Sequence, residues 1–172
     1  MSVKKILIEP NKLLRQVSKS VEKVGNEERA LMDDMLETMY EAPGIGLAAI
    51  QIGIPKRIIV MDISRDENKK EPRYFVNPVI KNKNLDKSTY EEGCLSVPNQ
   101  FAEIERPNKC EVEYLDYEGK KQLLKAEGLL ATCIQHEIDH LEGILFIDYL
   151  SKLKRSMIIK KLSKIKPNQI VI

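Results

Sequence analysis

Two segments of the chain repeat apolar side chains at the spacing of an amphipathic helix. Residues 27–41 carry an apolar position every three to four residues, with Asn26 placed to cap the first turn and Pro43 placed to end the helix. Residues 128–141 show the same period, and Gly143 stands where a left-handed residue commonly closes a helix. The pattern therefore predicts one helix near the N-terminus and another in the C-terminal half.

Shorter apolar or alternating segments predict β-strands at residues 57–63, 73–80, 110–117 and 120–126. Glu118-Gly119 joins the last two as a tight hairpin, and the alternation around Cys110 turns that side chain toward a core. Strands with helices before, within and after them predict an α+β fold rather than a doubly wound sheet. We expect mixed or antiparallel strands packed around the helix of residues 128–141, with further helices near both termini.

A length of 172 residues is that of one compact domain with its own core. Three cysteines, at positions 94, 110 and 133, are too few and too scattered for a disulfide-stapled secreted protein. The first residues lack the long apolar run of a signal peptide, and the longest apolar stretch, residues 44–54, is too short to cross a bilayer. We expect a soluble, cytoplasmic monomer with no membrane contact.

The net charge of +2 hides a strongly basic C-terminal segment. Residues 151–172 hold seven lysines or arginines and no acidic residue, which leaves a charge of −5 on residues 1–150. A third helix is predicted at residues 152–166, with one apolar stripe made by Leu153, Met157, Ile158, Leu162 and Ile165. This helix is either docked with a solvated charged face or a surface for anionic RNA.

Both histidines of the chain fall in one short motif, His136-Glu137-Ile138-Asp139-His140. On a helix, His136 and His140 lie one turn apart on one face, where they can bind the same metal ion. A catalytic metal site usually has three protein ligands and one position left for water. Zinc proteases with this motif place a third histidine where this chain has Phe146, so the third ligand must be a thiolate or a carboxylate.

The three cysteines differ in how well they could supply that thiolate. Cys133 lies about 10.5 Å along the helix axis from His140, and Cys110 faces the core of the predicted sheet. Cys94 follows Gly93 in a predicted loop, whose flexible backbone could bring the sulfur to a distant helix. We expect Cys94 to be the third ligand, and a buried structural cysteine is the alternative.

Three segments of the chain resemble the signature segments of the peptide deformylase family. They are residues 44–51 (GIGLAAIQ), 92–96 (EGCLS) and 135–140 (QHEIDH), and the likeness extends over nearly the whole chain. The resemblance implies a catalytic domain in residues 1–150, with residues 151–172 as its basic helix and tail. It also implies removal of the N-formyl group from the initiator N-formylmethionine of nascent polypeptides, with release of formate. The implied cofactor is one Fe²⁺ ion per chain, which Zn²⁺ or Ni²⁺ can replace.

The residues of these motifs are consistent with that reaction. A metal ion held by two imidazoles and a thiolate lowers the pKa of a bound water, which can then attack the formyl carbon. Glu137 is placed to take the proton of this water and to pass it to the departing amine. The resemblance assigns the donors for the oxyanion to the side-chain amide of Gln51 and the backbone N–H of Leu95. For Gln51 taken by itself, a solvated loop residue is the alternative.

The resemblance further implies an apolar pocket for the methionine side chain and a strand-like grip on the peptide backbone. The substrate-binding residues are then Ile45, Gly46, Tyr90, Gly93, Arg106, Leu129, Thr132 and Cys133, with His136 at the pocket wall. Arg106 either supports the site or forms a surface ion pair. Gln135 and Asp139 are expected to orient ligands, and for Asp139 a polar position on the helix surface is the alternative. Bacterial members of the family can contact the ribosome through an extension like residues 151–172, and we expect that contact here.

Two other functions compete with this interpretation. A zinc endopeptidase of the H-E-x-x-H class would use a downstream glutamate as third ligand in place of Cys94. A non-catalytic interaction domain would hold a metal ion and bind chain termini without hydrolysis. Such a domain has no use for a base beside its metal, so Glu137 favours an enzyme.

Overall fold

The structure is a computed structural model that describes residues 2–64 and 66–165. The helices within this part of the chain are η1 (Lys12–Arg15), α1 (Asn26–Glu41), η2 (Ala49–Ile52), α2 (Gly128–Leu141), η3 (Phe146–Tyr149) and α3 (Lys152–Ser163), where η marks a 3-10 helix. The strands are β1 (Gly46–Ala48), β2 (Ile58–Met61), β3 (Arg73–Lys83), β4 (Lys87–Cys94), β5 (Val97–Pro107), β6 (Lys109–Leu115) and β7 (Lys121–Glu127). The predicted α+β class is confirmed.

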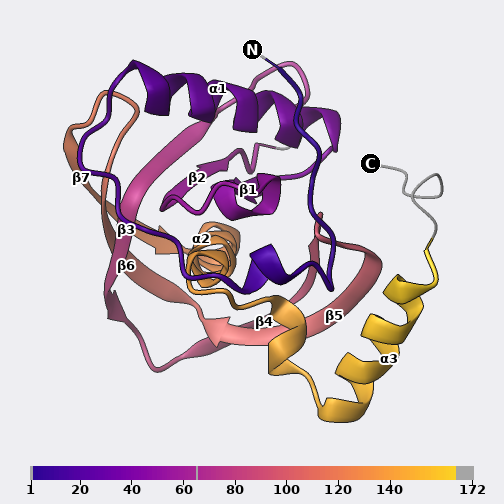
Figure 1. Ribbon diagram of the computed structural model, residues 1–172. Helices are drawn as coiled ribbons and strands as arrows, with labels where there is room; N and C mark the ends of the chain where they lie inside the picture. The colour runs from indigo at the N-terminus through magenta and orange to yellow at the C-terminus, as the bar shows by residue number, and fades with distance from the viewer. Residues whose placement is uncertain (1, 65, 166–172) are drawn as a thin grey trace.

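The strands form one larger sheet and one hairpin. Five strands pair in the order β1-β2-β3-β6-β7, while β4 and β5 pair with each other, and every pairing between these described strands is antiparallel. Figure 1 shows α2 nearly end-on at the centre of the molecule, between the larger sheet and the β4–β5 hairpin, with α1 across the top and α3 at the periphery. The central helix can therefore receive side chains from both sheets.

The buried strand β2 explains how the larger sheet carries helices on both faces. Ile58 and Val60 pack in the cluster that α1 covers, while Ile59 and Met61 pack in the cluster around α2. Successive side chains of a strand point to opposite faces, so a strand covered on both sides is apolar at every position. This is why the sequence shows a continuous apolar run here rather than an alternation.

The helix α2 follows the predicted boundaries, and Gly143 has the left-handed φ of 74° expected of a residue that closes a helix. Gly119, with φ of 81°, lies in the predicted hairpin turn between β6 and β7. Cys110 is 4% exposed, which confirms that it faces a core. Across residues 2–64 and 66–165, the structure contains no helix with the length and apolar character needed to span a membrane.

Two local expectations were wrong, and so was the alternative considered for Gln51. Asn26 does not cap α1; it is the first helical residue, and the cap is Gly25, whose N–H donates to Glu28 Oε2 at 3.0 Å. The segment around Cys94 is the end of strand β4 and not a loop. The sequence did not predict this strand because β4 and β5 expose one face and so lack the apolar signal of a strand. Gln51 is 1% exposed in η2 and is not a solvated loop residue.

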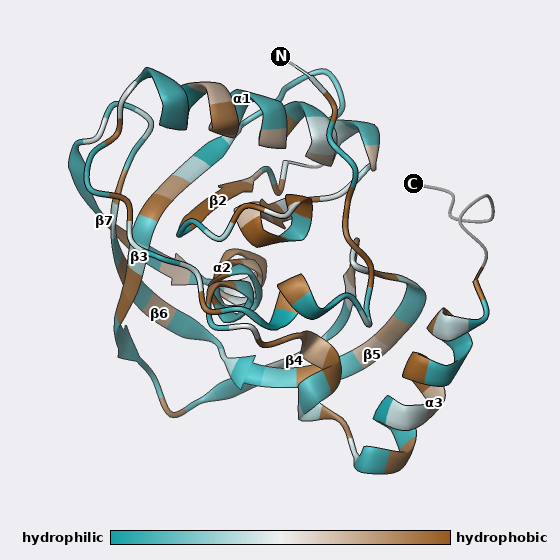
Figure 2. Ribbon diagram, in the orientation of Figure 1, coloured by the Kyte–Doolittle hydropathy of each residue, from teal (hydrophilic) through white to brown (hydrophobic). Residues whose placement is uncertain are grey.

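The C-terminal helix buries less of its apolar surface than its sequence predicts. Ile158 and Leu162 are buried, but Leu153 and Met157 are 72% and 52% exposed, so the five apolar residues do not form one covered stripe. The covered side packs under β5 and η3, and the rest of α3 is largely hydrophilic (Figure 2). The helix ends at Ser163, with Lys164 as its cap, so the predicted extension to residue 166 is wrong.

Candidate active site

The sulfur of Cys94 lies against the two histidines of α2. Cys94 Sγ is 3.3 Å from His140 Nε2, and the histidine rings, one turn apart, have centroids separated by 5.0 Å. The ligand atoms of Cys94, His136 and His140 all lie within 4.8 Å of one another. Two ligands of one tetrahedral zinc ion are on the order of 3.5 Å apart, so these three side chains are arranged to share an ion.

The state of the surrounding side chains also fits a bound metal ion. His136 Nδ1 bonds Glu92 Oε1 at 2.9 Å, which leaves Nε2 of that ring for a metal. Glu137 Oε2 is buried without a hydrogen-bond partner among the described residues, so a polar ligand is needed to satisfy it. A thiolate with two imidazoles is a donor set that suits iron, zinc and nickel alike.

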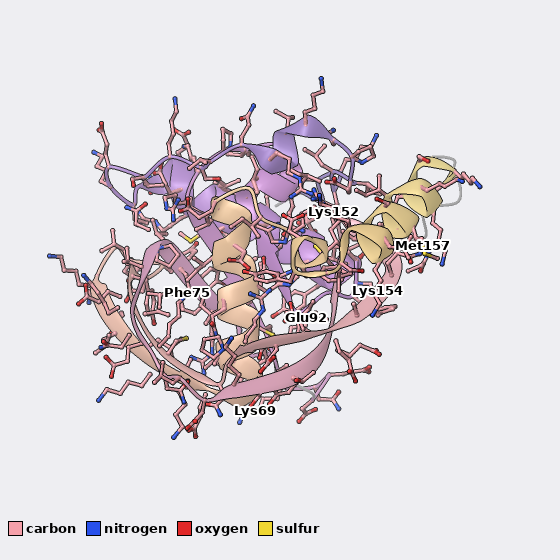
Figure 3. All side chains as sticks on the ribbon, turned by 90° about the horizontal axis from the view of Figure 1, so that it is seen from below. Lys69, Phe75, Glu92, Lys152, Lys154 and Met157 are labelled. Atoms are coloured by element: carbon pink, nitrogen blue, oxygen red, sulfur yellow. The ribbon has the colours of Figure 1, made fainter. Side chains whose placement is uncertain are left out.

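Glu92 belongs to an ion-pair network that the sequence did not reveal. Arg106 Nε and Nη2 donate to its two carboxylate oxygens at 2.7 and 3.0 Å, and Arg106 Nη1 donates to Asp139 Oδ2 at 2.8 Å. Burial alone would raise the pKa of the Glu92 carboxyl, but hydrogen bonds from His136 and Arg106 hold that pKa below its ordinary value. Glu92 therefore stays ionised and keeps accepting from the His136 ring. Figure 3 shows Glu92 beside the central helix.

Arg106 is thus 4% exposed and not a surface residue, so the surface ion pair considered for it is wrong. It is also absent from the cavity-lining residues that the structure describes. Gln135 bonds the backbone oxygens of Pro107 and Ala131 at 2.8 and 2.9 Å, so its amide ties α2 to the end of β5.

Gln51 is held firmly beside the cysteine. Its Nε2 lies 3.5 Å from Cys94 Sγ and donates to Ser96 Oγ at 3.0 Å, while its Oε1 accepts from the Ala48 N–H at 2.9 Å. These three contacts fix the orientation of the amide, because a rotation that exchanged its oxygen and nitrogen would break them. Leu95 follows Cys94 directly, so its backbone N–H lies in the same turn.

A cavity of about 510 Å³ opens over these residues. Seven of the eight predicted substrate-binding residues line it, namely Ile45, Gly46, Tyr90, Gly93, Leu129, Thr132 and Cys133, together with Gln51, Cys94, Leu95, His136 and Glu137. Phe101, at 65% exposure, and Pro98 and Asn99 also line it and were not predicted. No sequence signal could have found Phe101, because its place depends on the β4–β5 pairing.

Two glycines of the cavity are required by close approaches. A Cβ at Gly93 would lie 2.6 Å from the Phe101 ring, so Gly93 makes room for that ring rather than for a flexible loop. A Cβ at Gly46 would lie 2.6 Å from Glu137 Oε1, so the backbone of β1 packs directly against this carboxylate. Real Cβ atoms are not found at such distances, and each site therefore depends on the missing side chain.

Burial also sets the protonation of two groups in the cavity wall. Burial raises the pKa of the Glu137 carboxyl to about 7, despite the opposing effect of His136. Burial raises the pKa of the Cys133 thiol to about 12, with the Glu137 charge adding to the effect. Cys133 thus remains a neutral thiol near neutral pH, as expected of a wall residue.

A cluster of one cysteine and two histidines, with a buried carboxylate beside it at the cavity wall, defines a metal-dependent hydrolase of the H-E-x-x-H type. The family model described as Polypeptide deformylase matches residues 3–156. The chain belongs to the polypeptide deformylase family and is a deformylase, so the predicted resemblance is confirmed. The endopeptidase and the non-catalytic domain are not favoured.

Similar proteins support this assignment at high identity. The chain is 85% identical to a peptide deformylase of Pelagibacter ubique over 100% of both chains, and 57% identical to one of Rhizobium meliloti over 95% of this chain and 94% of that protein. A crystal structure of the Ehrlichia chaffeensis peptide deformylase in complex with actinonin has a TM-score of 0.90 and 48% identity, and the match covers 95% of this chain and 98% of that one.

Proposed function

We propose that this protein removes the formyl group from the N-formylmethionine of nascent polypeptides, using Cys94, His136 and His140 to hold one Fe²⁺ ion, which Zn²⁺ or Ni²⁺ can replace. The observation that carries the proposal is the placement of three ligand atoms within 4.8 Å of one another, beside the unpaired Oε2 of Glu137. When bound, the ion would polarise the formyl oxygen and lower the pKa of water, so that hydrolysis proceeds near neutral pH.

The side chains of the chain itself then move the protons. Glu137 accepts a proton from the attacking water while the water oxygen adds to the formyl carbon. The Gln51 amide and the Leu95 N–H donate to the oxygen that becomes negative in this step. Glu137 then delivers its proton to the peptide nitrogen as the C–N bond breaks, which releases formate and a free amino terminus. Its buried position beside Gly46 keeps the carboxylate aimed at the cavity.

The residues that line the cavity bind the substrate. Leu129, Thr132 and Cys133 lie on one side of α2 and line the cavity, where they form an apolar wall suited to a methionine side chain. Ile45, directly before β1, Gly46 on β1 and Gly93 on β4 offer backbone groups to an extended peptide between them. Arg106 contributes through Glu92 rather than by touching the peptide.

One assay tests this function. The purified protein, loaded with Fe²⁺ under anaerobic conditions or with Ni²⁺, is given N-formyl-Met and N-acetyl-Met peptides, and formate release is measured alongside bound metal. We expect formate from the formylated peptide, one metal ion per chain, and far slower hydrolysis of the acetylated peptide. A metal-loaded protein that releases no formate would contradict the proposal.

We also propose that residues 1–150 form the catalytic part, that residues 151–172 are its basic helix and tail, and that the protein works as a monomer in the cytoplasm. The monomer is supported by the completeness of the ligand cluster and the cavity wall within a single chain, which need no residue from a second copy. The cytoplasm is supported by Cys94, which must remain a thiolate, and by free thiols at all three cysteines within the described residues.

The basic helix α3 is proposed to bind ribosomal RNA. Lys152, Lys154, Lys160 and Lys161 are all exposed, and the first two, labelled in Figure 3, lie in the first turn of α3. Replacing the four lysines by glutamine is expected to reduce co-sedimentation with ribosomes at low salt about tenfold or more, because fewer counterions are released. Replacing the same four by arginine keeps the charge and is the matched control. Equal co-sedimentation of the glutamine variant and the unaltered protein would contradict this contact.

Gly46→Ala is expected to lower kcat/KM for formylated peptides about 100-fold, with metal content unchanged. The new methyl group would collide with Glu137 Oε1 and push the carboxylate away from the water it serves. Gly25→Ala is the matched control, because a Cβ there would meet Glu28 Oε2 at an ordinary 3.4 Å. Steady-state kinetics and metal analysis of both variants check this, and an unimpaired Gly46→Ala enzyme would show that Glu137 tolerates the displacement.

A further inference from the structure

A line of hydrogen bonds leads from the metal-site histidine to an exposed tyrosine. His136 Nδ1 bonds Glu92, Glu92 accepts from Arg106, and Arg106 donates to Asp139 Oδ2 at 2.8 Å. The line ends at Tyr149, whose hydroxyl donates to the same Asp139 Oδ2 at 2.7 Å. Five side chains from α2, β4, β5 and η3 are therefore connected by polar contacts between the metal site and the surface.

Tyr149 touches this line at two points. Besides its bond to Asp139, its ring lies over the guanidinium of Arg106, with 4.9 Å between Cζ and the ring centroid. Asp139 and Arg106 have side-chain exposures of 19% and 5%, so the aromatic ring stands between their ion pair and the solvent. A cation on an aromatic face is held more strongly when water is excluded, and an ion pair is stronger in a drier place.

The packing of the neighbouring elements does not require this ring. Tyr149 is 52% exposed, while η3 and α3 are anchored by Phe146, Ile147, Ile158 and Leu162, which are all buried in one cluster. Tyr149 makes a hydrogen bond to Asp139 and places its ring over the Arg106 guanidinium, and both of these contacts involve charged groups. A side chain placed in this way is suited to orienting its neighbours and adds little to the apolar core.

We propose that Tyr149 is a positioning residue for the metal centre: it holds Asp139 and Arg106 in place, and through Glu92 it fixes the orientation of the His136 ring. The inference rests on the proposed function, since it takes His136 as a metal ligand. Groups that orient a histidine ligand commonly change metal affinity 10-fold to 100-fold when they are removed. Tyr149 acts two contacts further out than Glu92, through Arg106, and its expected effect is therefore at the low end of that range.

The rate of metal release tests the proposal independently of catalysis. The full chain is loaded with Co²⁺, whose visible absorption reports its coordination, and release to excess EDTA is followed as that absorption disappears. Tyr149→Leu is expected to release Co²⁺ about tenfold faster than the unaltered protein. Tyr149→Phe keeps the ring over Arg106 and loses only the hydroxyl, so its release rate is expected to lie between the two.

Leu162→Ala is the control for a purely structural role. It weakens the docking of α3 and lowers the Tm, but it lies on α3, which supplies none of the five connected side chains, so we expect Co²⁺ release at the unaltered rate. In an Asp139→Asn background, Tyr149→Leu is expected to add less than it does alone, because the two residues act through one contact.

The outcomes separate this inference from the proposed function. Unchanged release from Tyr149→Leu, or equally fast release from Leu162→Ala, would overturn the role of Tyr149 and leave the metal site standing. Failure of the unaltered protein to bind Co²⁺ would overturn the metal site and the inference with it.

Discussion

Glu137→Gln is expected to lower kcat/KM for N-formylmethionyl peptides about 1000-fold while the protein remains folded and loaded with metal. The amide has nearly the shape of the carboxylate, so its fit against Gly46 in the buried site is preserved. It cannot accept a proton from water, however, and it has none to give to the departing amine. Formate release, metal content and circular dichroism measured on one preparation check the three parts of this expectation.

The control for this variant is Glu105→Gln, the same chemical change at an exposed position of β5. It is expected to keep the activity of the unaltered enzyme. Formate release at an undiminished rate from metal-loaded Glu137→Gln would show that another group handles the proton, and the proposed mechanism would be wrong.

Cys94→Ala is expected to weaken metal binding by at least about 100-fold and to abolish formate release at ordinary metal concentrations. The methyl group offers no electron pair, so only His136 and His140 of the three clustered ligands remain. A catalytic ion normally needs three protein ligands, and deleting one is more severe than disturbing a group that merely orients a ligand. Metal analysis after dialysis, followed by activity with added Ni²⁺, measures both effects.

Cys110→Ala makes the matched comparison, since it removes a thiol that is 4% exposed in the core of the larger sheet. It is expected to lower the Tm through loss of packing and to retain one metal ion per chain. Full metal retention by Cys94→Ala would mean that a carboxylate completes the site, as in the endopeptidase interpretation.

Much of the site was predictable because its chemistry lies in short segments. His136, Glu137 and His140 stand on one helical period, and the helix forms with the predicted boundaries. Cys94 was identified by eliminating the other cysteines, and the structure places its sulfur 3.3 Å from His140 Nε2. The predicted surroundings of Cys94 were partly wrong, because Cys94 ends a strand and Gly93 makes room for the Phe101 ring instead of forming a flexible loop.

The residues that surround the metal ligands could not be predicted from the sequence in the same way. Arg106 stands in a strand of mixed polar and apolar residues, and its sequence neighbours give no sign that it is buried between Glu92 and Asp139. No local sequence pattern indicates the roles of Tyr149 and Phe101. Tyr149 meets Arg106, and Phe101 meets Gly93, only in the folded chain. The role of Gly46 likewise depends on β1 lying against α2.

The sequence by itself determined the central helix, the pairing of His136 and His140 on one face with Glu137 between them, and the family, because helical period and motif spacing act within a few residues. The tertiary structure alone decided how the β4–β5 hairpin closes on that helix, which groups orient His136, and what lines the cavity. Those contacts join segments far apart in the chain, and their geometry follows from packing between elements rather than from any local preference.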